Sequence, residues 1–241
     1  MTEFLFRDDP ALRACDAAVT ASADGAVEFD RTVFYAASGG QPGDAGRLRL
    51  PSGDEIAIVD TIHPERDRMR IAHVLADGAT VPEPGSMVRL ELDWPRRHRL
   101  MRMHTALHLL SVAMPFGVTG GSIGEDRSRL DFDMPEPPEN VAAVEAWVNA
   151  RIDEDLPVTA EWITEDELAA APEMVKTMKV KPPVGQGRVR LIRIGTGGGT
   201  VDLQPCGGTH VARTGEIGRV RIGKIEKKGR ENRRVNLHFA D

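Results

Sequence analysis

The sequence predicts an α+β protein in which a small N-terminal β-barrel, residues 1–93, precedes an α+β domain with a mainly antiparallel sheet, residues 94–241. Three observations predict this organisation. Short segments of alternating apolar and polar residues fill the first part of the chain, and this period of two is typical of half-buried strands. The apolar period then lengthens to three or four residues, which indicates helices. From residue 189 the alternating pattern returns.

The first domain contains six segments with strand character, separated by turn sequences. Asp24-Gly25 lies between two of them and predicts a hairpin. Cys15 stands in a strand-like run with no second cysteine nearby, so we expect it to pack in the core. Six short strands at this spacing fit a small barrel or a sandwich. The segments are 18–22, 26–34, 46–50, 55–59, 69–74 and 87–93.

A long helix is predicted where the second domain begins. Pro95 suits the first turn of a helix, with Asp93 or Trp94 near its N-cap, and Pro115 marks its end. Apolar residues recur every three or four positions along this segment, at Leu100, Met103, Leu107, Leu110 and Met114. One face of the helix is therefore expected to be buried.

The remainder of the second domain is predicted to form two more helices and four strands. A helix is predicted at about 138–156, and Thr164-Glu-Asp-Glu167 is a capping box for a short third helix. Strands are predicted at 189–194, 201–203, about 217–226 and 233–239, the last two joined by a turn at 227–232.

Composition excludes several protein classes. The 241 residues are 41% hydrophobic, enough for ordinary cores, and no apolar run approaches the length of a membrane-spanning helix. Two cysteines make no disulfide framework, and we see no secretory signal, so we expect a protein of the reducing cytoplasm with no membrane partner.

The net charge of −6 is unevenly distributed. Residues 213–234 carry nine bases against three acids, and Arg96, Arg97, Arg99 and Arg102 form a second basic cluster. Local potential governs phosphate binding, so these clusters are candidates for a nucleic-acid surface. A solvated charged face is the alternative interpretation.

Two pairs of side chains have the spacing of metal ligands. His104 and His108 lie one turn apart on the predicted helix and border its apolar stripe, so neither should face open water. Cys206 and His210 flank two glycines, which favour a tight turn that brings both side chains toward one point. Imidazole and thiolate together suit Zn²⁺ in tetrahedral geometry.

Other zinc chemistries are excluded by single residues. A metalloprotease helix needs Glu after the first His, where this chain has Thr105. The zinc deaminase pattern needs a second Cys where Thr209 stands.

Together these motifs resemble the editing domain of alanyl-tRNA synthetase and its freestanding relatives, the AlaX-type editing proteins. The resemblance spans nearly the whole chain. In length the chain resembles the longer freestanding form, in which a barrel with a glycine motif precedes the editing domain. It is carried by residues 34–44 (FYAASGGQPGD), 104–110 (HTALHLL), 202–211 (DLQPCGGTHV), 214–218 (TGEIG) and 224–234 (KIEKKGRENRR).

The resemblance implies a zinc-dependent hydrolase that removes serine, and as a second candidate glycine, from tRNA(Ala). It implies Zn²⁺ as the cofactor, held by His104, His108, Cys206 and His210. The synthetase's activation core has no room here, so neither ATP use nor aminoacylation is expected. Four protein ligands close the coordination sphere, so either one ligand is loose, with His210 the candidate, or the metal orients the substrate while a nearby water attacks.

Contacts with the substrate are expected at three places. Residues 118–124 look like the family's segment that recognises the misattached side chain, and in it Thr119 and Ser122 are the candidates. Thr119 departs from the Gln that the synthetases tend to have, and its other interpretation is a turn residue. The turn of Gly39, Gly40 and Gln41 either lines the approach to the site or only needs positive φ. The amides of Gly207 and Gly208 are candidates to stabilise the oxyanion.

The acceptor end of tRNA is expected to meet the basic segments, with contacts from Arg96, Arg97, Lys227, Lys228, Arg230, Arg233 and Arg234. A monomer or a weak homodimer is expected. Two other functions fit the same residues: a non-catalytic RNA-binding module with a structural zinc, and a hydrolase of another small ester or thioester.

Overall fold

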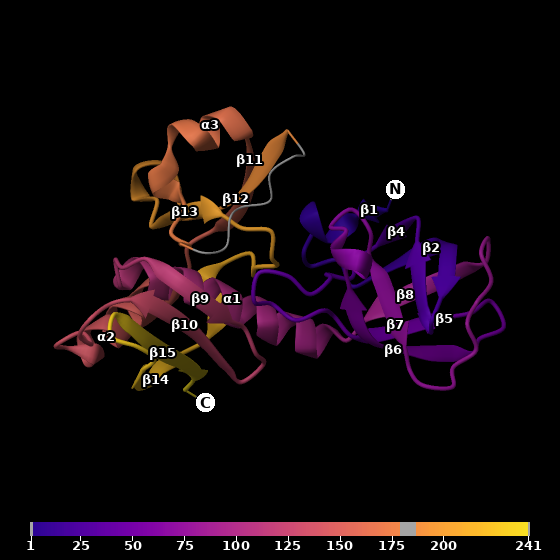
Figure 1. Ribbon diagram of the computed structural model, residues 1–241, viewed down its shortest axis with the longest axis horizontal. Coiled ribbons are helices and arrows are strands. Elements are labelled where there is room, and N and C mark those ends of the chain that lie inside the picture. The colour runs from indigo at the N-terminus through magenta and orange to yellow at the C-terminus, as the bar shows by residue number, and fades with distance from the viewer. Residues whose placement is uncertain (1, 179–186, 241) are drawn as a thin grey trace. The chain divides into compact units, whose positions relative to one another are not determined.

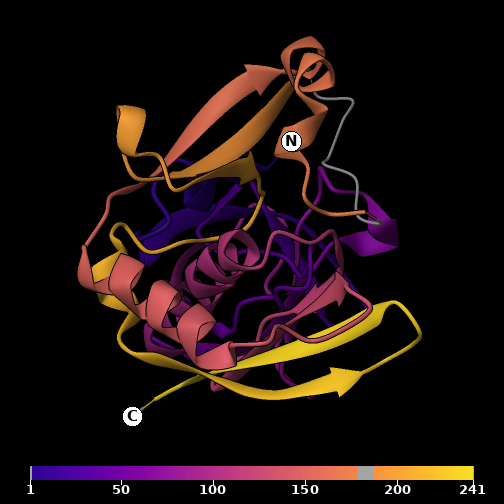
Figure 2. The ribbon, with the colours of Figure 1, turned by 90° about the vertical axis from the view of Figure 1, so that its left-hand side faces the viewer.

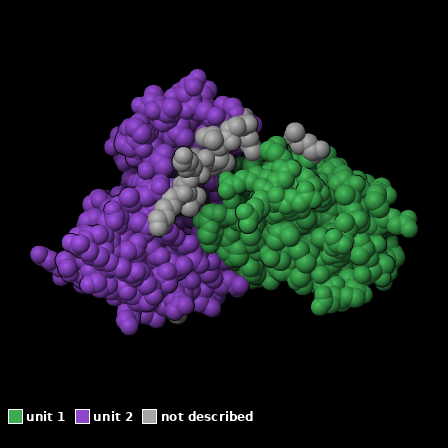
Figure 3. Space-filling model, viewed as in Figure 1, with its two compact units in different colours: residues 1–98 green, residues 99–241 purple. Residues whose placement is uncertain are grey.

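The computed structural model describes residues 2–178 and 187–240. The chain forms two compact units, residues 1–98 and 99–241 (Figure 1, Figure 3). The sequence pattern changes near residue 93, immediately before helix α1 (Trp94–Ala113), and the division at residue 98 lies inside this helix. No helix among the described residues combines the length and the apolar character needed to cross a membrane.

The first unit is built on a closed six-stranded barrel, which selects the barrel over the sandwich. Its strands pair antiparallel in the order β2-β3-β7-β6-β5-β8. Asp24 and Gly25 both have positive φ and join β2 to β3, as the hairpin prediction required. The bounds are β2 Ala14–Ala23, β3 Ala26–Phe29, β5 Gly46–Arg49, β6 Glu55–Ile62, β7 Ala72–Leu75 and β8 Met87–Leu92, with β1 Glu3–Phe4 paired parallel to β4 Arg31–Thr32.

The predicted segment 26–34 is two strands in the structure, β3 and β4, rather than one. Inside the barrel, His73 is fully buried and makes edge-on contacts with the rings of Phe29 and Phe34. Cys15 packs against the same core, as predicted, and burial raises the pKa of its thiol to about 11.

Arg97 corrects one prediction. Its side chain is fully buried and ion-paired with Asp44, and it also donates to the Val33 carbonyl at 2.8 Å. The Asp44 carboxylate accepts a further hydrogen bond from the amide of Tyr35 at 2.6 Å. The prediction that Arg97 contacts tRNA is wrong, because this guanidinium holds the glycine-motif segment to the start of α1.

The glycine motif contains a tight turn between Ser38 and Gln41. Each of these two residues donates its amide to the other's carbonyl, at 3.0 and 2.9 Å, across Gly39 and Gly40, which both have positive φ. The interpretation of a turn that needs positive φ is confirmed. Gln41 is buried, and a substrate contact by this turn stays a prediction.

The described residues of the second unit form two antiparallel sheets rather than the one expected. The larger has the order β14-β15-β10-β9, and Figure 2 shows α1 and α2 on one side of it. Leu130, Phe132, Val235 and Leu237 are buried on this sheet. The bounds are β9 Val118–Ser122, β10 Arg127–Asp133, α2 Val141–Asp153, β14 Val220–Lys227 and β15 Asn232–Phe239.

The smaller sheet has the order β11-β12-β13, comprising Val158–Thr164, Arg188–Ile194 and Asp202–Pro205. Helix α3 (Glu165–Ala170) begins with the predicted capping box, in which Thr164 and Glu167 bond each other's amides. Strands β9, β10 and β11 were not predicted. Short 3₁₀ helices lie at Leu5–Arg7, Pro64–Arg66, Pro172–Met174, Gly197–Gly199 and Thr214–Ile217.

Candidate metal centre

Helix α1 supplies two imidazoles from its buried side. Asp93 accepts a hydrogen bond from the amide of Arg96 at 3.1 Å, which makes Asp93, one of the two predicted candidates, the N-cap residue. The five predicted apolar residues of the stripe are all buried. His104 and His108 are 8% and 7% exposed, so the expectation that they avoid open water is confirmed.

The other two side chains come from the turn that follows strand β13. The amide of Cys206 donates to the Arg190 carbonyl at 3.1 Å. The Arg190 guanidinium in turn donates to the carbonyls of Cys206 and Gly208, at 3.1 and 2.9 Å. Strand β12 therefore fixes both ends of the Cys-Gly-Gly turn, and this holds Cys206 toward α1.

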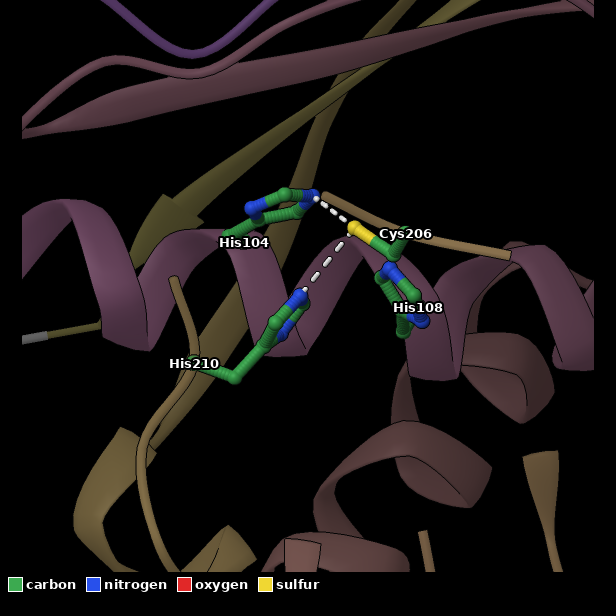
Figure 4. Close-up of side chains that lie close together, drawn as sticks. All are labelled: His104, His108, Cys206 and His210. Atoms are coloured by element: carbon green, nitrogen blue, oxygen red, sulfur yellow. Dashed lines mark hydrogen bonds between the residues drawn. The ribbon is translucent and has the colours of Figure 1, made fainter. Parts of the chain in front are cut away.

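The four side chains converge on one point (Figure 4). One ligand atom from each of His104, His108, Cys206 and His210 lies within 4.8 Å of all the others. The Cys206 Sγ is 3.5 Å from His104 Nε2 and 3.3 Å from His210 Nε2. These separations fit a tetrahedral zinc ion, whose thiolate and imidazole ligands lie ~3.6 Å apart.

The electrostatics at Cys206 and His210 favour the forms in which these two residues bind metals. Burial alone would raise the pKa of the Cys206 thiol, but His104 and His210 hold that pKa well below its usual range. Burial and the charge of His104 hold the pKa of His210 well below its usual range. A thiolate and a neutral imidazole are the ligand forms of these residues.

His108 is tied to a buried carboxylate. Its Nδ1 lies 2.9 Å from Asp202 Oδ2, and the Asp202 side chain has no exposed surface. Burial alone would lower the pKa of His108, but Asp202 and Cys206 raise it to about 9. A metal ion binding to this imidazole therefore competes with a proton.

Asp202 has further partners that keep it ionised. Lys176 Nζ lies 2.5 Å from its Oδ1, and Gln204 Nε2 donates to its Oδ2 at 2.7 Å. Burial would raise the pKa of Asp202, but His108 and Lys176 hold it at about 2. The carboxylate thus orients His108 so that Nε2 faces the cluster, an arrangement common at zinc sites.

His210 is oriented by a hydroxyl instead. Thr105 Oγ1 donates to the Met101 carbonyl at 3.0 Å and lies 3.1 Å from His210 Nδ1. With the hydroxyl hydrogen directed at Met101, the oxygen accepts from Nδ1–H, and this tautomer leaves Nε2 free to bind a metal.

Sequence reasoning gave no role to Asp202, Lys176 or Gln204, and used Thr105 only to exclude a protease. One signal was available, since Asp202 is a charge between Val201 and Leu203 in a predicted strand. A charged residue in such a position is buried only with partners.

The two glycines of the turn differ. Among the described residues, and apart from the chain neighbours of Gly207, no atom lies within 4 Å of the position that a Cβ on Gly207 would take. The amide of Gly208 points at the Cys206 sulfur, at 3.4 Å. Gly208 is therefore corrected from an oxyanion donor to a donor for the thiolate, while Gly207 stays a prediction.

Thr119 lies in strand β9, so it is not the turn residue of the alternative interpretation. Its hydroxyl donates to the Asp131 carbonyl at 3.1 Å and accepts from Asn232 Nδ2 at 2.6 Å. Ser122 ends the same strand opposite Arg129. A substrate contact by Thr119 would compete with these two bonds, and both substrate roles stay predictions.

Most of the predicted basic surface is paired with acids. Arg233 is buried and donates to backbone carbonyls, so its predicted tRNA contact is corrected to a structural role. Arg234 pairs with Asp131, and Lys228 with Glu226. The side chain of Arg230 is 94% exposed, and Lys227 is exposed as well.

The Cys-Gly-Gly-Thr-His turn lies within a segment that matches a domain found in tRNA synthetases. The family model described as "Threonyl and Alanyl tRNA synthetase second additional domain" matches residues 189–236. The alanine–tRNA ligase of Pyrobaculum arsenaticum is 36% identical over 239 residues, covering 94% of this chain. The chain spans only a quarter of that ligase's length.

Two freestanding relatives match over more of their own length. The alanyl-tRNA editing protein AlaX-M of Methanosarcina acetivorans is 34% identical over 255 residues, covering the whole of both chains. The AlaX-L protein of Pyrococcus horikoshii is 32% identical over 98% of this chain and 58% of its own. This chain belongs to the family of AlaX-type alanyl-tRNA editing proteins.

Proposed function

We propose that this protein is a trans-editing hydrolase that removes serine, and less readily glycine, from mischarged tRNA(Ala). One observation carries the proposal. Four metal-binding side chains lie within 4.8 Å of one another, in a chain that matches an editing protein from end to end. Zn²⁺ is the proposed ion, held by His104, His108, Cys206 and His210, because three imidazoles and a thiolate suit it.

A bound zinc ion supplies a Lewis acid for the ester carbonyl or for a water molecule. The chain's own residues prepare the site around it. Asp202 and Thr105 fix the orientation of His108 and His210. The exposed Gly207 leaves its side of the turn open, so its amide is the remaining candidate to donate to the oxyanion.

Serine is proposed as the amino acid removed from the tRNA, for an energetic reason. A pocket shaped for alanine rejects an isostere with an added hydroxyl only weakly, so mischarging with serine needs a second, hydrolytic site. A site that binds the added hydroxyl handles glycine less well, because glycine lacks it.

The proposed tRNA contacts are the cations that remain once the buried Arg97 and Arg233 are excluded. They are Arg96, Lys227, Lys228, Arg230 and Arg234. Phosphate contacts of this kind make affinity sensitive to salt.

A specific observation favours a second candidate, an RNA-binding module with a structural zinc. Four protein ligands fill a tetrahedral coordination sphere, which is typical of structural sites. Such a protein binds tRNA but does not hydrolyse the ester.

The test is single-turnover deacylation of Ser-tRNA(Ala) and Gly-tRNA(Ala) by the zinc-loaded protein, with Ala-tRNA(Ala) and free serine methyl ester as comparison substrates. Editing predicts fast loss of serine and little loss of alanine. Tight tRNA binding without acceleration over buffer would establish the structural-zinc module. Equal cleavage of the simple ester would indicate a general esterase.

A further inference from the structure

Trp162 and Arg188 form a pair on the hairpin of strands β11 and β12. The Arg188 Cζ lies 4.4 Å from the centroid of the Trp162 ring. Trp162 is 36% exposed, and Arg188 is exposed as well. A large aromatic ring that stays this exposed offers an apolar surface for a partner.

The position of Trp162 in the sheet connects it with the metal centre. Trp162 lies directly opposite Arg190 in the antiparallel pair, and directly paired residues point to the same face of a sheet. Arg190 is the residue whose guanidinium donates to the carbonyls of Cys206 and Gly208. The ring therefore stands next to the side chain that holds the metal turn.

The same face continues into the metal centre. Two and four residues beyond Arg190, Ile192 and Ile194 pair with Gln204 and Asp202. Asp202 in turn reaches His108. One face of the β11-β12-β13 sheet thus carries three features in order along its strands. They are the Trp162–Arg188 pair, then Arg190, which holds the Cys-Gly-Gly turn, and then Asp202, which contacts His108. Strands β12 and β13 lie between α3 and α1 in both ribbon views (Figure 1, Figure 2).

We propose that Trp162 is a stacking platform for the unpaired terminal base of the RNA 3′ end. Arg188, beside it, contacts either that base or the phosphate of the same nucleotide. The inference rests on the proposed function, because an ester on the terminal ribose brings that base close to the metal centre. The base is a planar group adjoining that ester, and aromatic side chains with neighbouring arginines bind single-stranded bases in this way.

The chain contains a matched control in Trp147. This residue lies on α2 in the same unit, half-buried, with Arg151 Cζ 5.4 Å from its ring centroid. It shares the tryptophan–arginine chemistry but stands on a helix away from the β11-β12-β13 sheet. Its replacement removes a ring of the same size without touching the proposed platform.

The experiment measures binding of an uncharged acceptor-stem hairpin RNA ending in CCA by fluorescence anisotropy. The same RNA with an abasic terminal residue is the second ligand. The protein is the full chain with its zinc content measured, in five forms: wild type, Trp162→Ala, Trp162→Phe, Arg188→Ala and Trp147→Ala. Thermal melting and zinc content verify that each variant is folded.

Stacking predicts that Trp162→Ala weakens binding of the CCA hairpin about tenfold, while Trp162→Phe retains most of the affinity. Trp147→Ala should leave binding unchanged. With the abasic RNA, wild type and Trp162→Ala should bind equally, because the base that the ring contacts is gone. Arg188→Ala should weaken binding and reduce its salt dependence.

Equal affinity of Trp162→Ala and wild type for the CCA hairpin overturns the proposal, and so does a loss that persists with the abasic RNA. If the wild-type protein fails to deacylate Ser-tRNA(Ala) yet shows the base-dependent loss, the editing function fails and the platform stands. If deacylation is active and binding does not depend on Trp162, the platform fails and the editing function stands.

Discussion

Replacing Asp202 with Asn tests how the metal centre is organised. Asp202 is the fully buried carboxylate that contacts His108 Nδ1, Lys176 and Gln204. Asparagine keeps the size and one acceptor but removes the charge, so its carbonyl cannot serve His108 and Lys176 equally. His108 then loses the partner that fixes its tautomer, and Lys176 loses its counter-ion.

Two separate effects are expected, one on zinc affinity and one on the free energy of unfolding. Partners that orient a metal-bound histidine contribute about 10- to 100-fold in metal affinity. The pKa of Asp202 lies at about 2 instead of its ordinary 3.8, which corresponds to a stabilisation of about 2 kcal/mol above pH 4. Because the folded pKa is depressed, this stabilisation is present at neutral pH and is lost as the pH falls through 2. From the orienting contact with His108, Asp202→Asn should bind zinc about 30-fold more weakly at pH 7.5.

The assay is competition for zinc with a chromophoric chelator, monitored together with thermal unfolding. Asp131→Asn is the matched control, because Asp131 is a half-buried carboxylate that has two cationic partners, Arg129 and Arg234, but belongs to a different cluster from the four candidate ligands. A folded Asp202→Asn protein whose zinc affinity stays within twofold of wild type would refute the orienting role of the carboxylate.

Three further predictions follow from the same contacts. Thr105→Val should weaken zinc binding about tenfold while Thr105→Ser retains it, because only the hydroxyl fixes the His210 tautomer; equal chelator competition by both variants would count against this. Burial lowers the pKa of His73 to about 4, so the folded protein binds fewer protons there and the free energy of unfolding should fall by up to ~3 kcal/mol as the pH drops from 6.5 to 4. Urea melts should show this slope in wild type and a shallower one in His73→Gln; parallel slopes would contradict it. Removal of zinc by a chelator should abolish deacylation of Ser-tRNA(Ala), and added Zn²⁺ should restore it, whereas undiminished activity of the metal-free protein would exclude zinc-assisted hydrolysis.

The sequence by itself determined the local elements and the kind of chemistry. Period-two patterns and the Asp24-Gly25 turn identify the barrel strands, and the stripe from Leu100 to Met114 identifies α1, because each signal depends on neighbours within a few residues. The i and i+4 histidines and the Cys-Gly-Gly-Thr-His turn name the donor set in the same way. Strand β9 escaped prediction because its segment 118–122 contains two glycines and a single apolar residue. For β10 a signal was available, because Leu130 and Phe132 alternate with charged residues.

Only the tertiary structure decided which distant groups meet. It brings His104 and Cys206 together across 102 residues of chain, and it assigns partners to Asp202 and Thr105 that no local pattern announces. It also gives neighbouring arginines different environments. Arg97 is buried against Asp44, whereas Arg96, one position earlier, is half-buried and donates to the Gly43 carbonyl. The sequence shows which side chains can carry a charge, but their burial and their counter-ions depend on long-range packing. Burial and counter-ion decide whether a charged side chain stabilises the fold or is available to a ligand.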